Sequence, residues 1–307
     1  MASTTRFSGS DRPILSSLRN RTLTLSPELK PMLLIALVMA VILWGIAFQV
    51  RTHNLVLTWD DLIVSFSNSL SYLQRPYDTL NFYNPPWTHL FLIPFDPLPL
   101  ELAALVHILL YCLLLTLVVR KFGGGKWALL LTLTSVLAVD MAIEINIDWL
   151  IYLGLLVPPA WSAPFLMVKP QAAWGYVLSF SRTEFLRAVL VGAVVLGLSF
   201  IIWGNWPQAL QAALAVDEVN RMANTAPLNF LPVWAVVPFG IGLLIYAFRK
   251  RDPLLCTLAG YCFVPYISVN STLLIFALMA TRWPRLMLFL SAVMWFILGS
   301  LAIQTFG

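Results

Sequence analysis

Charged residues are scarce in this chain, and their scarcity excludes a soluble fold. Asp, Glu, Lys and Arg make up 11% of the 307 residues, against roughly 25% in soluble domains. Hydrophobic residues make up 60%, and apolar runs long enough to cross a bilayer core of about 30 Å recur along the chain. We therefore predict an all-α, polytopic membrane protein. The net charge of +5 does not indicate nucleic-acid binding, because the basic residues lie in short clusters between apolar runs, as in cytoplasmic loops.

Cysteine and histidine are also few, and neither is spaced as a metal site requires. The cysteines lie in apolar surroundings, so we interpret them as small buried core residues. The histidines form no HxxxH or HExxH pattern. We therefore expect no metal site and no bound cofactor. The residues concerned are Cys112, Cys256, Cys262, His53, His89 and His107.

The first 30 residues are polar and rich in Ser, Thr and Arg, unlike the rest of the chain. We predict a disordered cytoplasmic tail over 1–30 and a single transmembrane domain over 31–307. The positive-inside rule then places the N-terminus in the cytoplasm and residues 51–98 outside, as the first extracytoplasmic loop. We expect an integral membrane protein of the bacterial plasma membrane.

The apolar runs fit about eight or nine transmembrane helices, with interfacial helices in the outer loops. Apolar residues at helical spacing predict an amphipathic helix over 60–74, at the outer surface of the membrane. A short apolar helix over 85–95 is too short to cross, so it is expected to be interfacial or re-entrant. A further interfacial helix is expected over 207–222.

Two apolar segments are harder to place. The run 149–168 has the length of a span, so it is expected to cross the membrane and bring Lys169 to the inner face, although its prolines must break the helix. The run 254–280 is too short for two full spans. Either two half-helices meet near 265–270, or one span departs from the positive-inside rule.

Acidic residues gather on the side that this topology places outside. Because only Lys and Arg define the topology, the sorting of the acids is independent information. It places any carboxylate chemistry at the outer leaflet. The acids are Asp60, Asp61, Asp78, Asp140, Glu144, Asp148, Asp217 and Glu218.

The segment 59–99 is polar where most of the chain is apolar, and it opens on Asp60 and Asp61. Taken alone, these acids are typical of a helix N-terminus, where a carboxylate caps free N–H groups and interacts favourably with the helix dipole. The Tyr83–Pro86 stretch, taken alone, indicates a turn. A functional interpretation needs the order of several such motifs.

Seven short motifs follow one another along residues 50–280. They are Asp61-Leu62, Pro76-Tyr77-Asp78, Tyr83-Asn84-Pro85-Pro86, Pro94 through Pro99, Asn146-Ile147-Asp148, Lys169-Pro170-Gln171, and Val264-Pro265-Tyr266 with Asn270. Their order resembles the GT-C glycosyltransferases, specifically the polyprenol-phosphate-mannose-dependent α-mannosyltransferases of the GT87 kind. The chain departs from that family at Ser65, where the family has tyrosine, and at Ile145, where it has glycine.

The resemblance implies a GT-C-like fold and an enzyme that transfers a sugar, mannose in that family, from a polyprenyl-phosphate donor with inversion. The acceptor is left open. An acceptor hydroxyl has a pKa far above 7, so a carboxylate must take its proton; Asp61 matches that position, with Asp60 beside it. The donor phosphate needs cationic partners. The substrate-binding candidates are Arg51, Arg75, Tyr77, Tyr83, Asn84, Asp148, Arg221 and Asn270, with Asn146 as a weaker one. The structural candidates are Pro85, Pro86, Lys169, Pro170 and Gln171.

Two other functions remain open. A catalytically degenerate GT-C-like protein could serve as a scaffold or accessory subunit of a larger membrane complex, and the departures at Ser65 and Ile145 favour this alternative. A transporter is the third hypothesis, because broken helices are typical of substrate sites in transporters. The expected partners are the lipid bilayer and the lipid-linked donor, with protein subunits in the second case.

Overall fold

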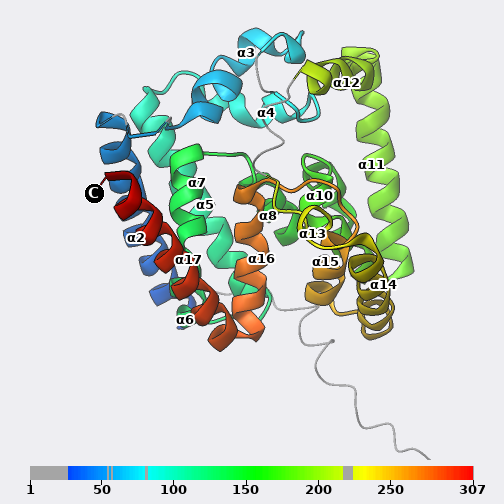
Figure 1. Ribbon diagram of the computed structural model, residues 1–307. Coiled ribbons are helices and arrows are strands. Elements are labelled where there is room, and N and C mark those ends of the chain that lie inside the picture. Colours follow the sequence, from blue (N-terminus) through cyan, green and yellow to red (C-terminus); the bar gives the residue numbers. More distant parts are fainter. Residues whose placement is uncertain (1–26, 54, 57, 80–81, 217–223, 307) are drawn as a thin grey trace, which may run out of the picture.

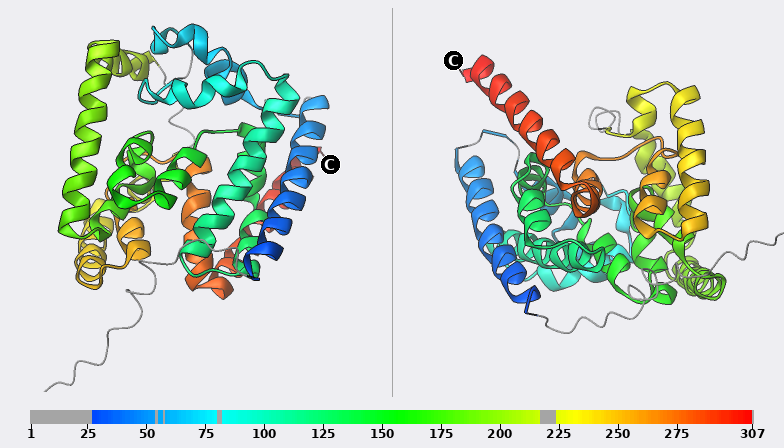
Figure 2. Two further views of the ribbon diagram at one scale, coloured as in Figure 1. Left: turned by 180° about the vertical axis from the view of Figure 1, so that it is seen from behind. Right: turned by 90° about the horizontal axis from the view of Figure 1, so that it is seen from below.

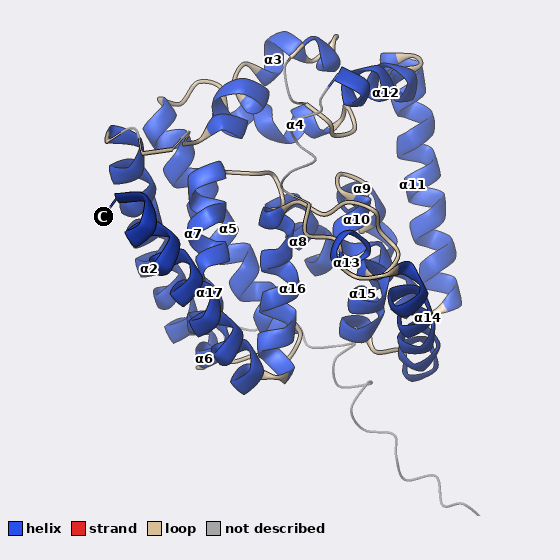
Figure 3. Cartoon of the chain, viewed as in Figure 1, coloured by secondary structure: helices blue, strands red, loops and turns tan. Residues whose placement is uncertain are grey.

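The computed structural model describes residues 27–53, 55–56, 58–79, 82–216 and 224–306. Over these residues the chain is helical and forms no strand, apart from an isolated bridge between Asn224 and Ser268 (Figure 3). The first half contains α2 (Leu29–Thr52), η1 (Asp61–Phe66), α3 (Ser69–Tyr72), η2 (Pro76–Asp78), α4 (Thr88–Leu92), η3 (Ile93–Phe95), α5 (Leu100–Lys121), α6 (Lys126–Leu133), α7 (Val136–Glu144) and α8 (Trp149–Leu156). The second half contains η4 (Pro159–Trp161), α9 (Ala163–Leu166), α10 (Pro170–Ala173), η5 (Trp174–Ser179), α11 (Arg182–Trp203), α12 (Trp206–Val216), α13 (Pro227–Phe230), α14 (Val233–Lys250), α15 (Pro253–Tyr261), α16 (Val269–Arg282) and α17 (Pro284–Phe306).

Four helices are long and apolar enough to cross a membrane: α2, α5, α11 and α14. A fifth span results if α6 and α7, which meet at an angle of 59°, count as one bent helix. The described residues thus form a helical membrane protein with four or five such spans, judged by length and composition. The remaining apolar segments are shorter helices that the chain breaks with prolines and turns.

The segment 149–168 is the clearest departure from the expected topology. α8 ends at Leu156, because prolines follow that provide no backbone N–H and keep the preceding residue out of the helical conformation. The chain then doubles back through η4 and α9. Asp148 and Lys169, at the two ends of the segment, form an ion pair with a distance of 2.7 Å between Nζ and Oδ1. The prediction that this run crosses the membrane and separates these two residues is therefore wrong.

The segment 254–280 forms two helices, α15 and α16, with a break between them. This is the first of the two expected arrangements, in which two half-helices meet near 265–270. Its two ends also meet, because Arg282 Nη2 lies 2.7 Å from Asp252 Oδ2. Asp252 is also the N-cap of α15, accepting hydrogen bonds from the backbone N–H groups of Leu254 and Leu255. The segment therefore runs out and back to the same place.

A layer of short helices covers one end of the long ones. Figure 1 and the left view of Figure 2 both show α3, α4 and α12 together at this end. The amphipathic helix expected over 60–74 is present in two pieces, η1 and α3, because Asn68 adopts a left-handed conformation with φ of 63°. The short helix expected over 85–95 is α4 followed by η3, and α12 covers the described part of the helix expected over 207–222.

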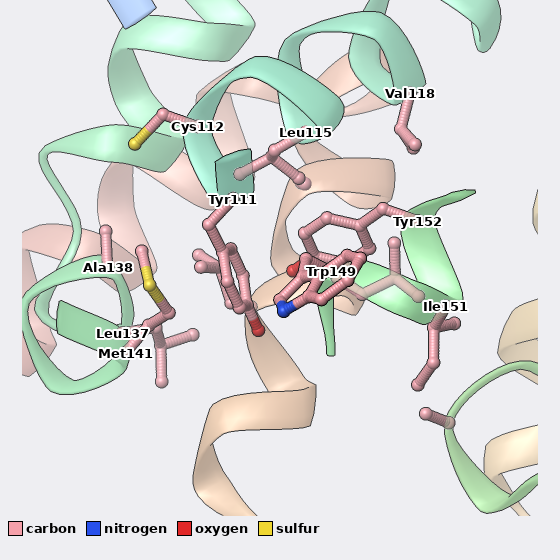
Figure 4. Close-up of a cluster of buried hydrophobic side chains, with 14 of the residues drawn as sticks. Tyr111, Cys112, Leu115, Val118, Leu137, Ala138, Met141, Trp149, Ile151 and Tyr152 are labelled. Carbon is pink, nitrogen blue, oxygen red and sulfur yellow. The ribbon is translucent and has the colours of Figure 1, made fainter. Parts of the chain in front are cut away.

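A cluster of large aromatic side chains packs beneath this layer, between α5 and α8. Figure 4 shows Tyr111 of α5 and Tyr152 of α8 turned toward each other, with Trp149 beside them. The rings of Tyr111 and Tyr152 meet edge to face, with centroids 5.0 Å apart. All three side chains are buried, and so are the three cysteines, as expected. This packing fixes the start of α8, and with it the residue that precedes α8, Asp148.

Candidate functional site

The first loop begins with a strained turn that brings Asp61 to the end of α7. Trp59 is completely buried and has a φ of 62°, a left-handed conformation that is uncommon for a residue with a side chain. Its backbone N–H donates to the carbonyl oxygen of Ile143, at 2.6 Å. The Arg51 guanidinium lies over the Trp59 ring, 5.2 Å from its centroid, and donates to the carbonyl oxygen of Thr58. These contacts place the acids that follow Trp59 against the end of α7.

Asp61 is the first member of a largely buried polar network that joins four separate parts of the chain. Asn146 Nδ2 donates to Asp61 Oδ2 at 2.8 Å, and Lys169 Nζ donates to Asn146 Oδ1 at 2.6 Å. Lys169 Nζ also lies 2.7 Å from Asp148 Oδ1. Ser271 Oγ, from α16, donates to Asp148 Oδ2 at 2.7 Å. The network thus contains Asp61, Asn146, Lys169, Asp148 and Ser271.

A second strained residue directs the chain from α7 into this network. Ile145 has φ of 52° and ψ of 70°, and it is completely buried. This left-handed region suits glycine, and for a β-branched residue it is a true outlier that costs about 1–3 kcal/mol. The resembled family has glycine at this position. The isoleucine therefore keeps the backbone conformation that a glycine would adopt freely, and the surrounding packing must hold it there.

Carboxylates outnumber ammonium groups around Asp61. Burial raises the pKa of Asp61 to about 7. The positive charge of Lys169 lowers the pKa of Asp61, whereas the negative charges of Glu144, Asp60 and Asp148 raise it. A carboxyl group that ionises near neutral pH is suited to accept a proton from a reacting hydroxyl. The site can therefore perform general base chemistry at Asp61.

The predicted catalytic residue Asp60 and the predicted substrate residue Asn270 each adjoin a member of the network in the sequence. Asp60 is half-buried next to Asp61. Asn270 is buried in α16 next to Ser271, and its Oδ1 has no hydrogen-bond partner among the described residues.

The predicted cations are not gathered at Asp61. Arg75 is exposed and forms a 3.9 Å surface contact with Asp78, whose side chain is also exposed. Arg51 contacts Trp59 and Thr58, as described above. Arg221 lies outside the described residues, as do the predicted outer acids Asp217 and Glu218. Lys169 is therefore the cation that the described residues bring to the network.

The tyrosine and proline motifs of the first loop shape the loop itself. Tyr77 Oη donates to the carbonyl oxygen of Asn84, which is buried. Pro85 and Pro86 are buried, and their carbonyl oxygens accept the first backbone hydrogen bonds of the α4 turn. Tyr83, which precedes Asn84, is half-buried. The proline contacts suit the structural role expected of Pro85 and Pro86. The hydroxyl of Tyr77 is bonded to the backbone of Asn84, within the loop itself.

The Lys-Pro-Gln motif combines a structural and a site residue. Pro170 is the first residue of α10, a position that suits proline because that N–H has no helical partner. Gln171 is half-buried in the same short helix. Lys169 was predicted to be structural only, and the network shows that it also belongs to the site.

Two residues of the site carry no sequence signal. Ser271 bonds Asp148, but a serine after Asn270 in an apolar run has nothing to mark it. Trp59 orients the acids by its backbone, and a left-handed tryptophan cannot be read from a sequence. Asn146, by contrast, stands in a motif of the resembled family and lies at the centre of the network.

Within the part of the chain that the structure describes, no group of three or more His, Cys, Asp or Glu side chains is arranged to hold a metal ion. Comparisons with protein families, curated proteins and solved structures find no match for this chain.

Proposed function

We propose that the protein is an integral membrane glycosyltransferase that transfers a sugar, mannose in the first instance, from a polyprenyl-phosphate donor to a hydroxyl acceptor. The observation that supports this most is the network itself. Asp61, Asn146, Asp148 and Lys169 stand in three motifs that are far apart in the sequence, and the structure joins them by direct contacts of 2.6–2.8 Å. Asn270 of a fourth motif lies next to Ser271, which bonds Asp148.

The proposed reaction is a single displacement at the anomeric carbon. The acceptor hydroxyl oxygen forms a bond to that carbon, while the bond between the carbon and the donor phosphate oxygen breaks. The bonding electron pair leaves on the phosphate oxygen, which releases polyprenyl phosphate. The hydroxyl proton passes to the ionised carboxylate of Asp61. Attack on the face opposite the leaving phosphate inverts the configuration.

The membrane arrangement that we propose puts this site at the extracytoplasmic face of a bacterial plasma membrane, with the N-terminus in the cytoplasm. Arg120, at the end of α5, pairs with Glu28, which precedes α2, at 2.8 Å. The start of α2 and the end of α5 therefore lie together, away from the loop that follows α2 and carries Asp61. Besides the four or five candidate spans, the out-and-back pairs α8–α9 and α15–α16 and the helix α17 would be embedded in the membrane in this arrangement.

Sugar transfer by the purified full-length protein in lipid tests this proposal. The assay supplies polyprenyl-phosphate mannose and other polyprenyl-phosphate sugars, and mass spectrometry follows the product. We compare Asp61→Asn with Asp78→Asn, a matched control in the same loop whose side chain is 61% exposed and pairs with Arg75 at the surface.

Transfer that is lost in Asp61→Asn and kept in Asp78→Asn supports the proposal. Equal transfer by the wild type and both variants rules out Asp61 as the base. If the wild type transfers none of the sugars, the enzyme proposal fails. Stoichiometric partner proteins would then favour the accessory subunit, and substrate flux into liposomes the transporter.

A further inference from the structure

The side-chain amide of Asn146 can adopt only one orientation in this site. Its Oδ1 lies 2.6 Å from Lys169 Nζ and 2.7 Å from the backbone nitrogen of Ile147. Both of these groups are donors, so turning the amide over would set its N–H groups against two other donors. The network therefore fixes Oδ1 toward Lys169 and Nδ2 toward Asp61. The same holds whether Asp61 is ionised or protonated, because neither neighbour of Oδ1 can accept a hydrogen bond there.

The fixed amide distinguishes the two oxygens of Asp61. Oδ2 accepts the Asn146 hydrogen bond at 2.8 Å, whereas no donor among the residues that the structure describes bonds Oδ1. We propose that Asn146 is a positioning residue: its amide, oriented by Lys169, holds Oδ2 of Asp61 and leaves Oδ1 to receive the proton of the acceptor. This inference rests on the proposed function for the identity of the proton donor.

The support behind Asn146 is rigid. Ile145, directly before it, is buried and held in a left-handed conformation. Lys169, which orients the amide, is itself held by Asp148, whose second oxygen accepts from Ser271. An amide supported in this way loses little freedom when it binds the carboxylate, as a preorganised site requires.

The charged groups that face Asp61 come from each element packed around it. Asp60 precedes it, Glu144 ends α7, Asp148 precedes α8 and Lys169 precedes α10. Asn146 differs from these charged neighbours, because its neutral N–H group stabilises the ionised carboxylate of Asp61 without adding charge. Removing this donor should raise the pKa of Asp61 by about one unit or more, the shift that corresponds to losing a hydrogen bond to a charged group.

The test is a direct titration of Asp61 in the full-length protein, in lipid nanodiscs and without any substrate. Aspartate labelled with ¹³C gives carboxylate infrared bands, and the difference from Asp61→Asn assigns the band of Asp61. The variants are Asn146→Ala and the isosteric Asn146→Asp, which places a second carboxylate against Asp61. The control is Asn205→Ala, an exposed asparagine that bonds Gln208 at the surface.

We expect the titration of Asp61 to move upward by about one pKa unit or more in Asn146→Ala, further in Asn146→Asp, and not in Asn205→Ala. If Asn146→Ala does not fold, Asn146→Asp decides the outcome alone. An unchanged titration in a folded Asn146 variant would overturn the inference. Because no substrate is present, this result is independent of sugar transfer. Where transfer is found, the acidic limb of the pH–rate profile must move with the titration, which a merely structural role would not cause.

Discussion

Replacing Lys169 by methionine tests whether the network is a buried ionic site. Methionine keeps an unbranched side chain of similar length and removes the positive charge. The side chains of Lys169 and Asp148 are 11% and 2% exposed, so the substitution leaves a carboxylate without its counter-ion away from water. Removing one partner of a buried ion pair costs about 3–5 kcal/mol in the free energy of unfolding. The lost hydrogen bond to Asn146 adds about 1 kcal/mol.

The measurement is reversible unfolding in mixed micelles, followed by circular dichroism, for Lys169→Met, Asp148→Asn and the double variant. Because Asp148→Asn removes the stranded charge, we expect the double variant to lose less stability than the sum of the single variants, with a coupling of about 2 kcal/mol. Arg75→Met is the control, since the pair of Arg75 and Asp78 is 82% and 61% exposed and should contribute less than about 1 kcal/mol. If Lys169→Met costs no more than Arg75→Met, the buried ionic network is refuted.

Three further predictions concern the support of the site and its titration. Gly175→Ala should prevent normal packing of η5 on α15, because its Cβ would lie 2.1 Å from the carbonyl oxygen of Cys256, and a loss of at least about 3 kcal/mol is expected in unfolding experiments. Trp87→Phe removes the 3.1 Å hydrogen bond from Nε1 to the carbonyl oxygen of Pro164 and should lower stability by about 1 kcal/mol. Burial raises the pKa of Asp61 from 3.8 to about 7, so the folded protein keeps a proton that the unfolded chain has released. The stability of the wild type relative to Asp61→Asn should therefore fall as pH rises from about 4 to about 7, and change little above.

A separate result would contradict each of these three predictions. Gly242→Ala is the control for Gly175→Ala, because no atom lies within 4 Å of the added Cβ and alanine favours a helix; equal stability of the two variants would contradict the packing described. A Trp87→Phe variant as stable as the wild type would show that its hydrogen bond contributes nothing. A stability difference between wild type and Asp61→Asn that does not change with pH would contradict the raised pKa of Asp61.

Hydropathy was enough to predict a helical membrane protein, because apolar runs of this length form few structures other than membrane-spanning helices. It could not predict that the run 149–168 doubles back, since length and composition are the same for a crossing and a re-entrant segment. The prolines in that run indicated a broken helix, which the structure has. Lys169 was placed on the wrong side for this reason alone, as its ion pair with Asp148 shows.

Some residues of the network could be predicted from the sequence, and others could not. Asp61, Asn146 and Asp148 stand in recognisable motifs, so they could be singled out before their contacts were known. Ser271 and the strained backbone of Trp59 could not, because they act through geometry that depends on the packed fold. Ile145 is the most instructive position: the side chain departs from the resembled family, yet the backbone keeps the left-handed conformation that suits the family's glycine.

The most direct test of the central claim is a high-resolution map of the full-length protein with bound polyprenyl phosphate, the product of the proposed reaction. We predict that the phosphate group lies beside Asp61 and Lys169, with Asp61 Oδ2 still bonded to Asn146. Polyprenyl phosphate bound only elsewhere, for instance with its head group in the apolar groove of α2 lined by Ile42, Ile46 and Leu55, would contradict the account.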